Sequence, residues 1–198
     1  TDCVVFNNSM PIDVCTLNIG GNVFTRDLAI GLNIPFAEAE RVKIFFGIGD
    51  HNKDKLLAVH SIIGKSIDIS YSRVFDILYP RIKEFSFLLA KSLLSHKGKL
   101  GAGIVLTGGG SEVQGLDEVL STLLKVPVQR SLPSLHTDIL ISKFEQLKTS
   151  MSYSTKYSTV LGLLQLEIYK LLKPHFFSSV RIHKGYLATF INWIKELT

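Results

Sequence analysis

The chain has 198 residues, 46% hydrophobic and 20% charged, a balance that indicates a folded globular protein and excludes an intrinsically disordered one. A net charge of +5 is compatible with an acidic peptide or an anionic membrane, but the absence of a dense basic block argues against nucleic-acid binding. Two cysteines make neither a disulfide framework nor a metal-ligand set, and no apolar run reaches the roughly 18–20 residues of a transmembrane helix.

The chain opens on Thr1-Asp2 and enters an apolar run at once, with neither an initiator methionine nor a signal peptide. This start is typical of a chain that begins inside a domain, and the lack of a cysteine framework separately predicts a cytosolic protein. Strands are predicted over 3–6, 12–18, 56–63, 66–70, 103–106 and 126–129, and helices over 25–32, 36–46, 73–95, 116–124, 157–172 and 180–197. The first two strands should form a hairpin, as should the next two, which the dipeptide Gly64-Lys65 would join.

A glycine loop is the sharpest motif of the sequence. The predicted strand ending at Leu106 runs through Thr107 into Gly108, Gly109 and Gly110, ahead of a helix. Glycine lets the backbone approach a ligand closely, and the helix N-terminus that follows favours an anion. The pattern is typical of a nucleotide-binding loop, although a tight strand-to-helix turn without any ligand has the same sequence.

Two charged pairs on predicted helices are further candidates for ligand contacts. Glu40 and Lys43 share one helix face, where the carboxylate could accept hydrogen bonds from ribose hydroxyls and the lysine stem could pack on a base. Arg81 and Glu84 have the same spacing in the long helix and form a mixed-charge strip suited to a charged peptide. Each pair would equally serve as a solvated surface ion pair, worth under about 1 kcal/mol.

The C-terminal segment is predicted to be an amphipathic membrane helix over 180–198, after a linker over 173–179 that contains Pro174. Basic residues accompany its apolar stripe, which includes Phe190, Ile191, Trp193, Ile194 and Leu197. An ordinary helix docked on the domain core is the alternative interpretation. No catalytic or metal centre is predicted, because the six histidines are scattered and Ser111 does not form a nucleophile elbow.

In their order along the chain, these segments resemble the FtsA family of bacterial cell-division proteins, within the actin-like ATPase superfamily. The glycine and Glu/Lys motifs are shared across actin-like proteins, whereas the Arg81/Glu84 helix and the amphipathic terminus narrow the resemblance to FtsA. Val160 departs from the alanine usual in the family, and the loop over 47–55 has no clear counterpart. The resemblance is carried by 1–6, 18–29, 39–43, 105–116, 157–164 and the terminal helix.

The resemblance implies an α/β fold, the C-terminal lobe of an actin-like ATPase. Residues 1–34 and 100–172 would form subdomain IIA, a mixed sheet with helices, and 35–99 would form subdomain IIB, inserted in it. The strand over 103–106 would then return to the sheet begun by the first hairpin. The linker and the membrane-targeting helix would follow.

The resemblance also implies what the intact family protein does. It would bind ATP with Mg²⁺ between two lobes, assemble into filaments, contact other divisome proteins and tether FtsZ to the cytoplasmic face of the inner membrane at the division site. Gly108–Gly110 would approach the adenosine and α-phosphate, and Glu40 and Lys43 the ribose and base. Arg81 and Glu84 would bind the FtsZ C-terminal tail. We expect an anchor more than an enzyme, with weak or no nucleotide binding and no appreciable hydrolysis when the N-terminal lobe is missing.

Two alternatives stay open. Another actin-like scaffold, of the pilus-assembly type, would lack a free membrane helix and would bind the tail of an inner-membrane protein. A remnant that binds no nucleotide is the other. Liposome flotation after deletion of 180–198 separates the two kinds of scaffold.

Overall fold

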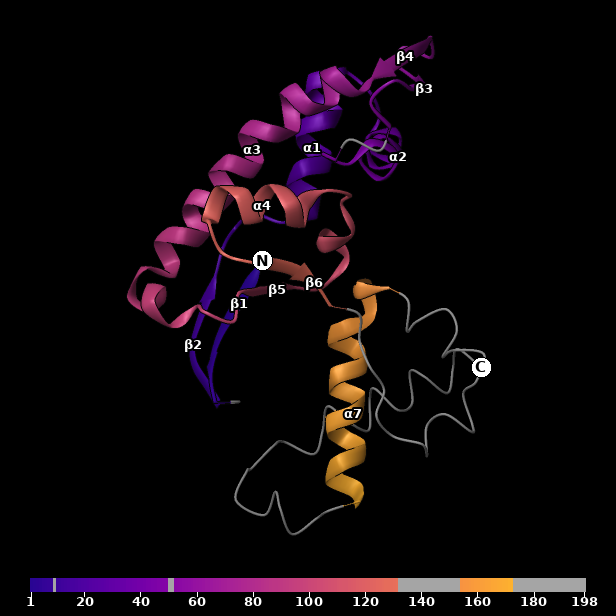
Figure 1. Ribbon diagram of the computed structural model, residues 1–198. Helices are drawn as coiled ribbons and strands as arrows, with labels where there is room; N and C mark the ends of the chain where they lie inside the picture. The colour runs from indigo at the N-terminus through magenta and orange to yellow at the C-terminus, as the bar shows by residue number, and fades with distance from the viewer. Residues whose placement is uncertain (9, 50–51, 132–153, 173–198) are drawn as a thin grey trace. The chain divides into compact units, whose positions relative to one another are not determined.

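The computed structural model describes residues 1–8, 10–49, 52–131 and 154–172 (Figure 1). Residues 1–159 form one compact unit, and residues 160–198 belong to a second. The first unit contains β1 (Asp2–Asn7), β2 (Met10–Thr16), α1 (Gly21–Leu32), α2 (Phe36–Phe46), β3 (Leu56–His60), β4 (Ser66–Ser70), α3 (Tyr71–Ser92), η2 (Leu94–Lys99), β5 (Ile104–Leu106), η3 (Gly109–Glu112), α4 (Leu116–Leu124), β6 (Val128–Arg130) and η4 (Thr155–Tyr157). Helix α7 (Ser158–Leu172) follows at the boundary between the units.

The described strands form three separate two-stranded sheets. Strands β1 and β2 pair antiparallel, as do β3 and β4, whereas β5 and β6 pair in parallel. The expectation that the strand over 103–106 joins the sheet of the first hairpin is therefore wrong for the described residues, where β5 pairs with β6 alone. Each pairing joins strands that are neighbours in the sequence, through a hairpin or through the α4 crossover, so none requires a distant strand.

Helix α1 begins four residues earlier than the sequence predicts, at Gly21 rather than Thr25. Gly20 has an extended backbone (φ −158°, ψ −174°), and its carbonyl accepts the Val23 N–H at 3.0 Å. Glycine is among the residues favoured at the N-cap, so Gly20 suits the position before the first turn. The helix thus starts at the two consecutive glycines, ahead of the predicted Thr25.

The hairpin β3–β4 turns over five residues, 61–65, instead of the predicted two. Ser61 N donates to Lys65 O at 2.8 Å, and Ser61 Oγ accepts from Lys65 N at 3.1 Å. Gly64 supplies a left-handed backbone, with φ +77°. These bonds within the loop satisfy backbone groups that a tighter turn would have placed in the strand ladder.

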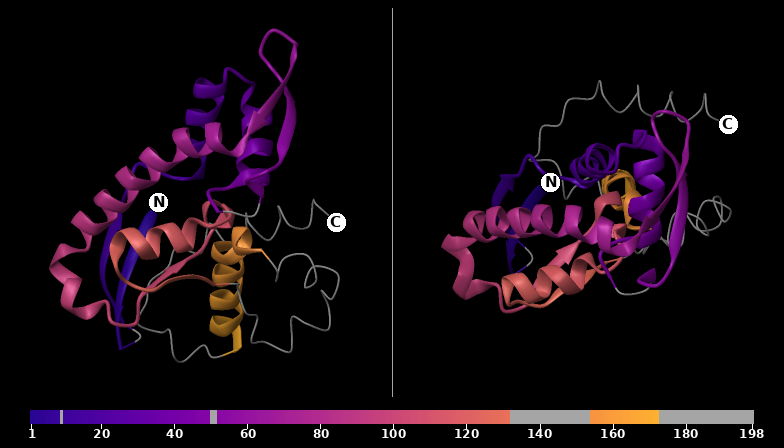
Figure 2. Two further views of the ribbon diagram at one scale, coloured as in Figure 1. Left: turned by 45° about the horizontal axis from the view of Figure 1, so that its top comes forward. Right: turned by 90° about the horizontal axis from the view of Figure 1, so that it is seen from above.

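Helices α1, α2, α3 and α4 share one hydrophobic core. Helix α3 lies alongside α1 and α4 (Figure 2) and presents one apolar face to them at helical spacing. Fully buried members of the core include Leu28, Val42, Phe46, Val74, Leu78, Ile82 and Leu120. The core continues across positions 34 and 99, where the resemblance places the subdomain boundaries. A continuous core does not locate these boundaries, which stay predictions.

Candidate functional site

Lys43 of α2 has a buried ammonium group beside the first turn of α1. Only 8% of its side chain is exposed. Nζ donates to Glu40 Oε2 at 2.7 Å, to Thr25 Oγ1 at 2.8 Å and to the Gly21 carbonyl at 3.3 Å. Three acceptors match the three donors of an ammonium group, so Lys43 connects α2 to α1 through hydrogen bonds. Because the side chain is buried, its aliphatic part offers little surface on which a base could pack.

Glu40 is the exposed partner in this cluster, with 39% of its side chain accessible. Its Oε2 also accepts a hydrogen bond from Thr25 Oγ1 at 2.5 Å, whereas Oε1 has no hydrogen bond within the described residues. Burial favours the neutral carboxyl, but the hydrogen bonds from Lys43 and Thr25 and the charge of Lys43 outweigh it and lower the pKa of Glu40. Glu40 therefore presents an ionised acceptor to solvent.

The glycine loop is held by two buried hydroxyl side chains. Gly108 has φ +84°, a conformation that favours glycine. Its N–H donates to Thr155 O at 2.9 Å, and its carbonyl accepts from Ser111 Oγ at 2.7 Å and from Thr155 Oγ1 at 3.0 Å. A Cβ at Gly108 would meet no atom within 4 Å, so the loop is anchored on one side and open on the other.

The glycine loop meets the Lys43 cluster at Gly21. A Cβ at Gly21 would lie 3.3 Å from Gly110 Cα and 3.7 Å from Lys43 Nζ. A side chain here would press on the Gly110 backbone, so glycine suits this close approach of two backbones. The structure brings together the five residues predicted to contact a nucleotide, which come from α2 and from the β5–α4 connection, at an α1 N-terminus that has no side-chain cap.

Arg81 and Glu84 form the pair expected from their spacing, with Nη1 at 2.6 Å from Oε2. Arg81 also binds Asp27 of α1 through one edge of its guanidinium group, where Nε donates to Oδ2 at 2.5 Å and Nη2 donates to Oδ1 at 3.2 Å. The hydrogen bond to Asp27 raises the pKa of Arg81; burial opposes it, and the charges of Asp27 and Glu84 add to it. Arg81 therefore connects α3 to α1 as well as lying beside the exposed Glu84.

The family model of Cell division protein FtsA matches residues 1–162. The chain belongs to the FtsA family. FtsA of Buchnera aphidicola subsp. Baizongia pistaciae is 29% identical over 99% of this chain and 48% of its own length. FtsA of Escherichia coli K12 is 26% identical over 89% of this chain and 42% of its own. The chain thus spans about half, or less, of the curated relatives that it matches.

Two solved structures share the actin-like fold that the resemblance predicts. MreB5 of Spiroplasma citri bound to ADP has a TM-score of 0.64 at 18% identity, over 87% of this chain and 52% of that one. The PilM–PilN type IV pilus biogenesis complex has a TM-score of 0.58 at 24% identity, over 84% of this chain and 42% of that one. The predicted family and the predicted actin-like α/β fold are both confirmed.

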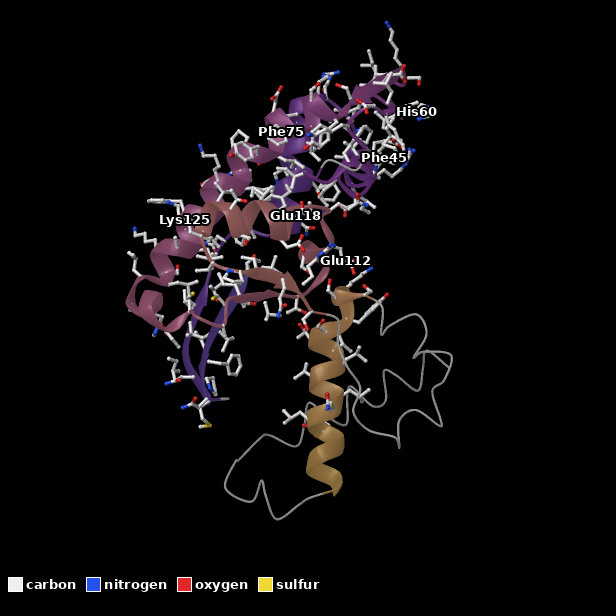
Figure 3. All side chains as sticks on the ribbon, viewed as in Figure 1. Phe45, His60, Phe75, Glu112, Glu118 and Lys125 are labelled. Carbon is white, nitrogen blue, oxygen red and sulfur yellow. The ribbon has the colours of Figure 1, made fainter. Side chains whose placement is uncertain are left out.

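The sequence did not predict several residues that build the candidate site. Thr25 and Asp27 lie within a motif that carried the family resemblance, but their partners Lys43 and Arg81 are distant in the chain. Thr155 falls in a segment predicted as loop, yet it is buried and anchors Gly108. Glu112, labelled in Figure 3, accepts from Ser154 Oγ and, at 3.4 Å, from Lys156 N. These roles depend on contacts between segments that are distant in the chain. The periodicity of a single segment does not predict such contacts.

We expect Thr155→Val to loosen the glycine loop. Valine keeps the shape of threonine but removes the hydroxyl from a site that is 3% exposed, so the Gly108 carbonyl loses one of its donors. The free energy of unfolding should fall by about 1–2 kcal/mol in urea denaturation. The matched control is Thr159→Val at an exposed position of α7, with an expected change within about 0.5 kcal/mol. Equal effects of the two variants would contradict the anchoring role.

The predicted membrane segment lies outside the described residues: the linker over 173–179 and, within 180–198, Phe190, Ile191, Trp193, Ile194 and Leu197. Within the part of the chain that the structure describes, no helix combines the length and apolar character needed to cross a membrane.

Proposed function

We propose that this FtsA-family chain is the nucleotide-binding C-terminal lobe of an actin-like membrane anchor for FtsZ. The observation that carries the nucleotide part is the convergence of the glycine loop, the uncapped start of α1 and the ionised Glu40 at Gly21. A helix N-terminus and open glycine backbone suit a phosphate, and a free carboxylate oxygen suits a pair of ribose hydroxyls. The ADP named in the MreB5 structure supports the same assignment.

The residues present fit an adenine nucleotide. Gly108–Gly110 would approach the adenosine and α-phosphate, and Glu40 would accept from the ribose through Oε1. Lys43 would act as a positioning residue, because its ammonium is used by Glu40, Thr25 and Gly21. Mg²⁺ would accompany the phosphates, and when bound with ATP it would help to neutralise their charge. We assign it no ligand among the described residues.

A titration with MgADP tests the nucleotide site. Gly109→Asp adds a carboxylate beside the proposed phosphate position, and its Cβ would lie 3.6 Å from Lys156 Cγ, in ordinary contact. The full chain should bind weakly, since half of the cleft would come from the other lobe, and Gly109→Asp should weaken binding at least about tenfold. Gly101→Asp, at a glycine with no atom within 4 Å of its Cβ, adds the same charge elsewhere and should bind as the parent does.

Two outcomes would contradict this proposal. One is nucleotide affinity that Gly109→Asp and Gly101→Asp change equally. The other is steady ATP turnover by the pure chain that Gly109→Asp abolishes, because we propose an anchor that does not hydrolyse ATP without the groups of a second lobe.

Membrane anchoring rests on the sequence of 180–198. Phe190→Glu should abolish binding to anionic vesicles, because burying one large apolar side chain is worth about 1.5–3 kcal/mol and a charge there opposes insertion. Asn192→Glu, outside the apolar stripe, adds the same charge and should retain most of the binding. Trp193 emission should shift to the blue when vesicles are added.

A helix packed on the domain gives the opposite result. Trp193 would then emit in the blue without lipid, and Phe190→Glu would lower the thermal midpoint by several degrees. Deletion of 180–198 with no loss of liposome flotation would favour the pilus-type scaffold instead.

A further inference from the structure

Cys3 of β1 and Cys15 of β2 are direct partners in the antiparallel register of the first hairpin. Residues directly opposite each other have Cα atoms about 4.5–5.5 Å apart, and disulfides form at about 4.4–6.8 Å. Both cysteines are free thiols and partly buried. The hairpin therefore places the two backbones at disulfide distance without any rearrangement of its strands.

The two side chains also face each other. Opposite residues of a hairpin project to the same side, so the Cys3 and Cys15 side chains lie on one face of it. Burial, the Cys15 thiol and the charge of Asp13 together raise the pKa of Cys3 to about 11. Asp13 lies two residues from Cys15 on the same face, and its Oδ2 is 2.8 Å from His96 Nε2. Cys3 thus stays protonated at neutral pH.

We propose that Cys3 and Cys15 are an oxidative modification site that closes to a reversible cross-strand disulfide. With glutathione disulfide as oxidant, the Cys15 thiolate attacks one sulfur and releases one glutathione. Cys3 then gives its proton to solvent, attacks the Cys15 sulfur of the mixed disulfide and releases the second glutathione. Two protein thiols are oxidised and one glutathione disulfide is reduced to two glutathione thiols.

The bond would close the hairpin shortly before the start of α1. Strand β2 ends at Thr16, and the chain reaches Gly21 of the candidate nucleotide site through a short connection. Leu17 N donates to Thr1 O at 2.8 Å within this connection. Oxidation should thus restrain the segment that leads into α1, and this inference stands independently of nucleotide or FtsZ binding.

The sequence allows a direct test on the full chain. Arg26 is the first lysine or arginine, so a single tryptic peptide, 1–26, carries both cysteines. The reduced chain is incubated with glutathione disulfide, alkylated and digested; this oxidant spares Met10 of the same peptide, which peroxide would oxidise. We expect the peptide to lose two hydrogens, about 2 Da, and to resist alkylation, in a yield independent of protein concentration and reversed by dithiothreitol.

Single variants provide the controls. Cys3→Ser and Cys15→Ser each keep one thiol and should give only a glutathione adduct. The oxidised parent should melt several degrees above its reduced form, because the bond restricts the unfolded chain, and neither variant should show this shift. A parent chain that accumulates stable glutathione adducts or disulfide-linked dimers in place of the internal bond would overturn the proposal. An oxidised form that melts below the reduced one would show that the native hairpin does not accommodate the bond.

Discussion

Replacing Glu40 with glutamine should lower the free energy of unfolding by about 2–3 kcal/mol, although Glu40 lies at the edge of its cluster. The cause is Lys43, whose side chain is 8% exposed and whose charge would lose its counter-ion. Breaking a buried ion pair from one side costs about 3–5 kcal/mol. The smaller value applies because Thr25, the Gly21 carbonyl and the glutamine oxygen still accept from Nζ.

Replacing Lys43 should lower the free energy of unfolding by less than neutralising Glu40 does. In Lys43→Met the remaining carboxylate is 39% exposed and is hydrated, so we expect a loss of about 1 kcal/mol. The double variant Glu40→Gln/Lys43→Met should resemble Lys43→Met, because no buried charge is left unpaired. Urea denaturation of the four chains measures this coupling. Equal and additive losses would show that Lys43 is not held by Glu40.

The pH dependence of the same variants gives an independent check. The folded pKa of Glu40 lies below its usual value of 4.5, so its ionised form stabilises the fold above that pH. This contribution is lost as the pH falls through the folded pKa. The stability difference between the parent and Glu40→Gln should therefore shrink below about pH 4.5. A difference that stays constant to lower pH would exclude the carboxylate as its source.

Segments with a clear period were predictable from the sequence. The helices at 36–46 and 116–124 were predicted with their observed bounds, and both hairpins were predicted as pairs of strands. Their apolar residues recur on one face, and that pattern is a property of the segment alone. The glycine loop and the Glu40–Lys43 spacing are likewise local, so their residues could be chosen before any fold was known.

Contacts between distant segments were not predictable in this way. Lys43 was interpreted as a ligand contact because spacing along α2 shows its neighbour Glu40 but not its acceptors on α1. Arg81 was predicted to pair with Glu84 and to contact a charged peptide, but its further partner Asp27 is 54 residues away in the chain and was not predicted. The pairing of β5 with β6 alone also depends on tertiary arrangement. In each case the prediction needed to know which helix and strand surfaces contact each other. Hydrophobic periodicity does not specify these contacts.

Charge reversal at Arg81 should weaken both the fold and the proposed binding of the FtsZ tail. Arg81→Glu places a carboxylate against Asp27, whose side chain is 19% exposed, and against Glu84. Loss of the bidentate ion pair and the new repulsion should lower the free energy of unfolding by about 3 kcal/mol. Weaker binding of a tail peptide by this variant would not by itself identify a contact, because α3 loses its connection to α1.

A charge swap separates the two effects. Asp27→Arg/Arg81→Asp restores an ion pair between α1 and α3 and should recover most of the thermal midpoint in calorimetry. If Arg81 contacts an acidic tail residue, the swap should still bind a synthetic FtsZ tail peptide at least about tenfold more weakly in calorimetric titration. Glu84→Gln changes a side chain that is 50% exposed, so its thermal midpoint should stay within about one degree of the parent value. Its affinity for the tail peptide should fall by no more than about fivefold. A swapped chain that folds and binds the tail as the parent does would assign Arg81 to the α1–α3 connection and place the tail on another surface.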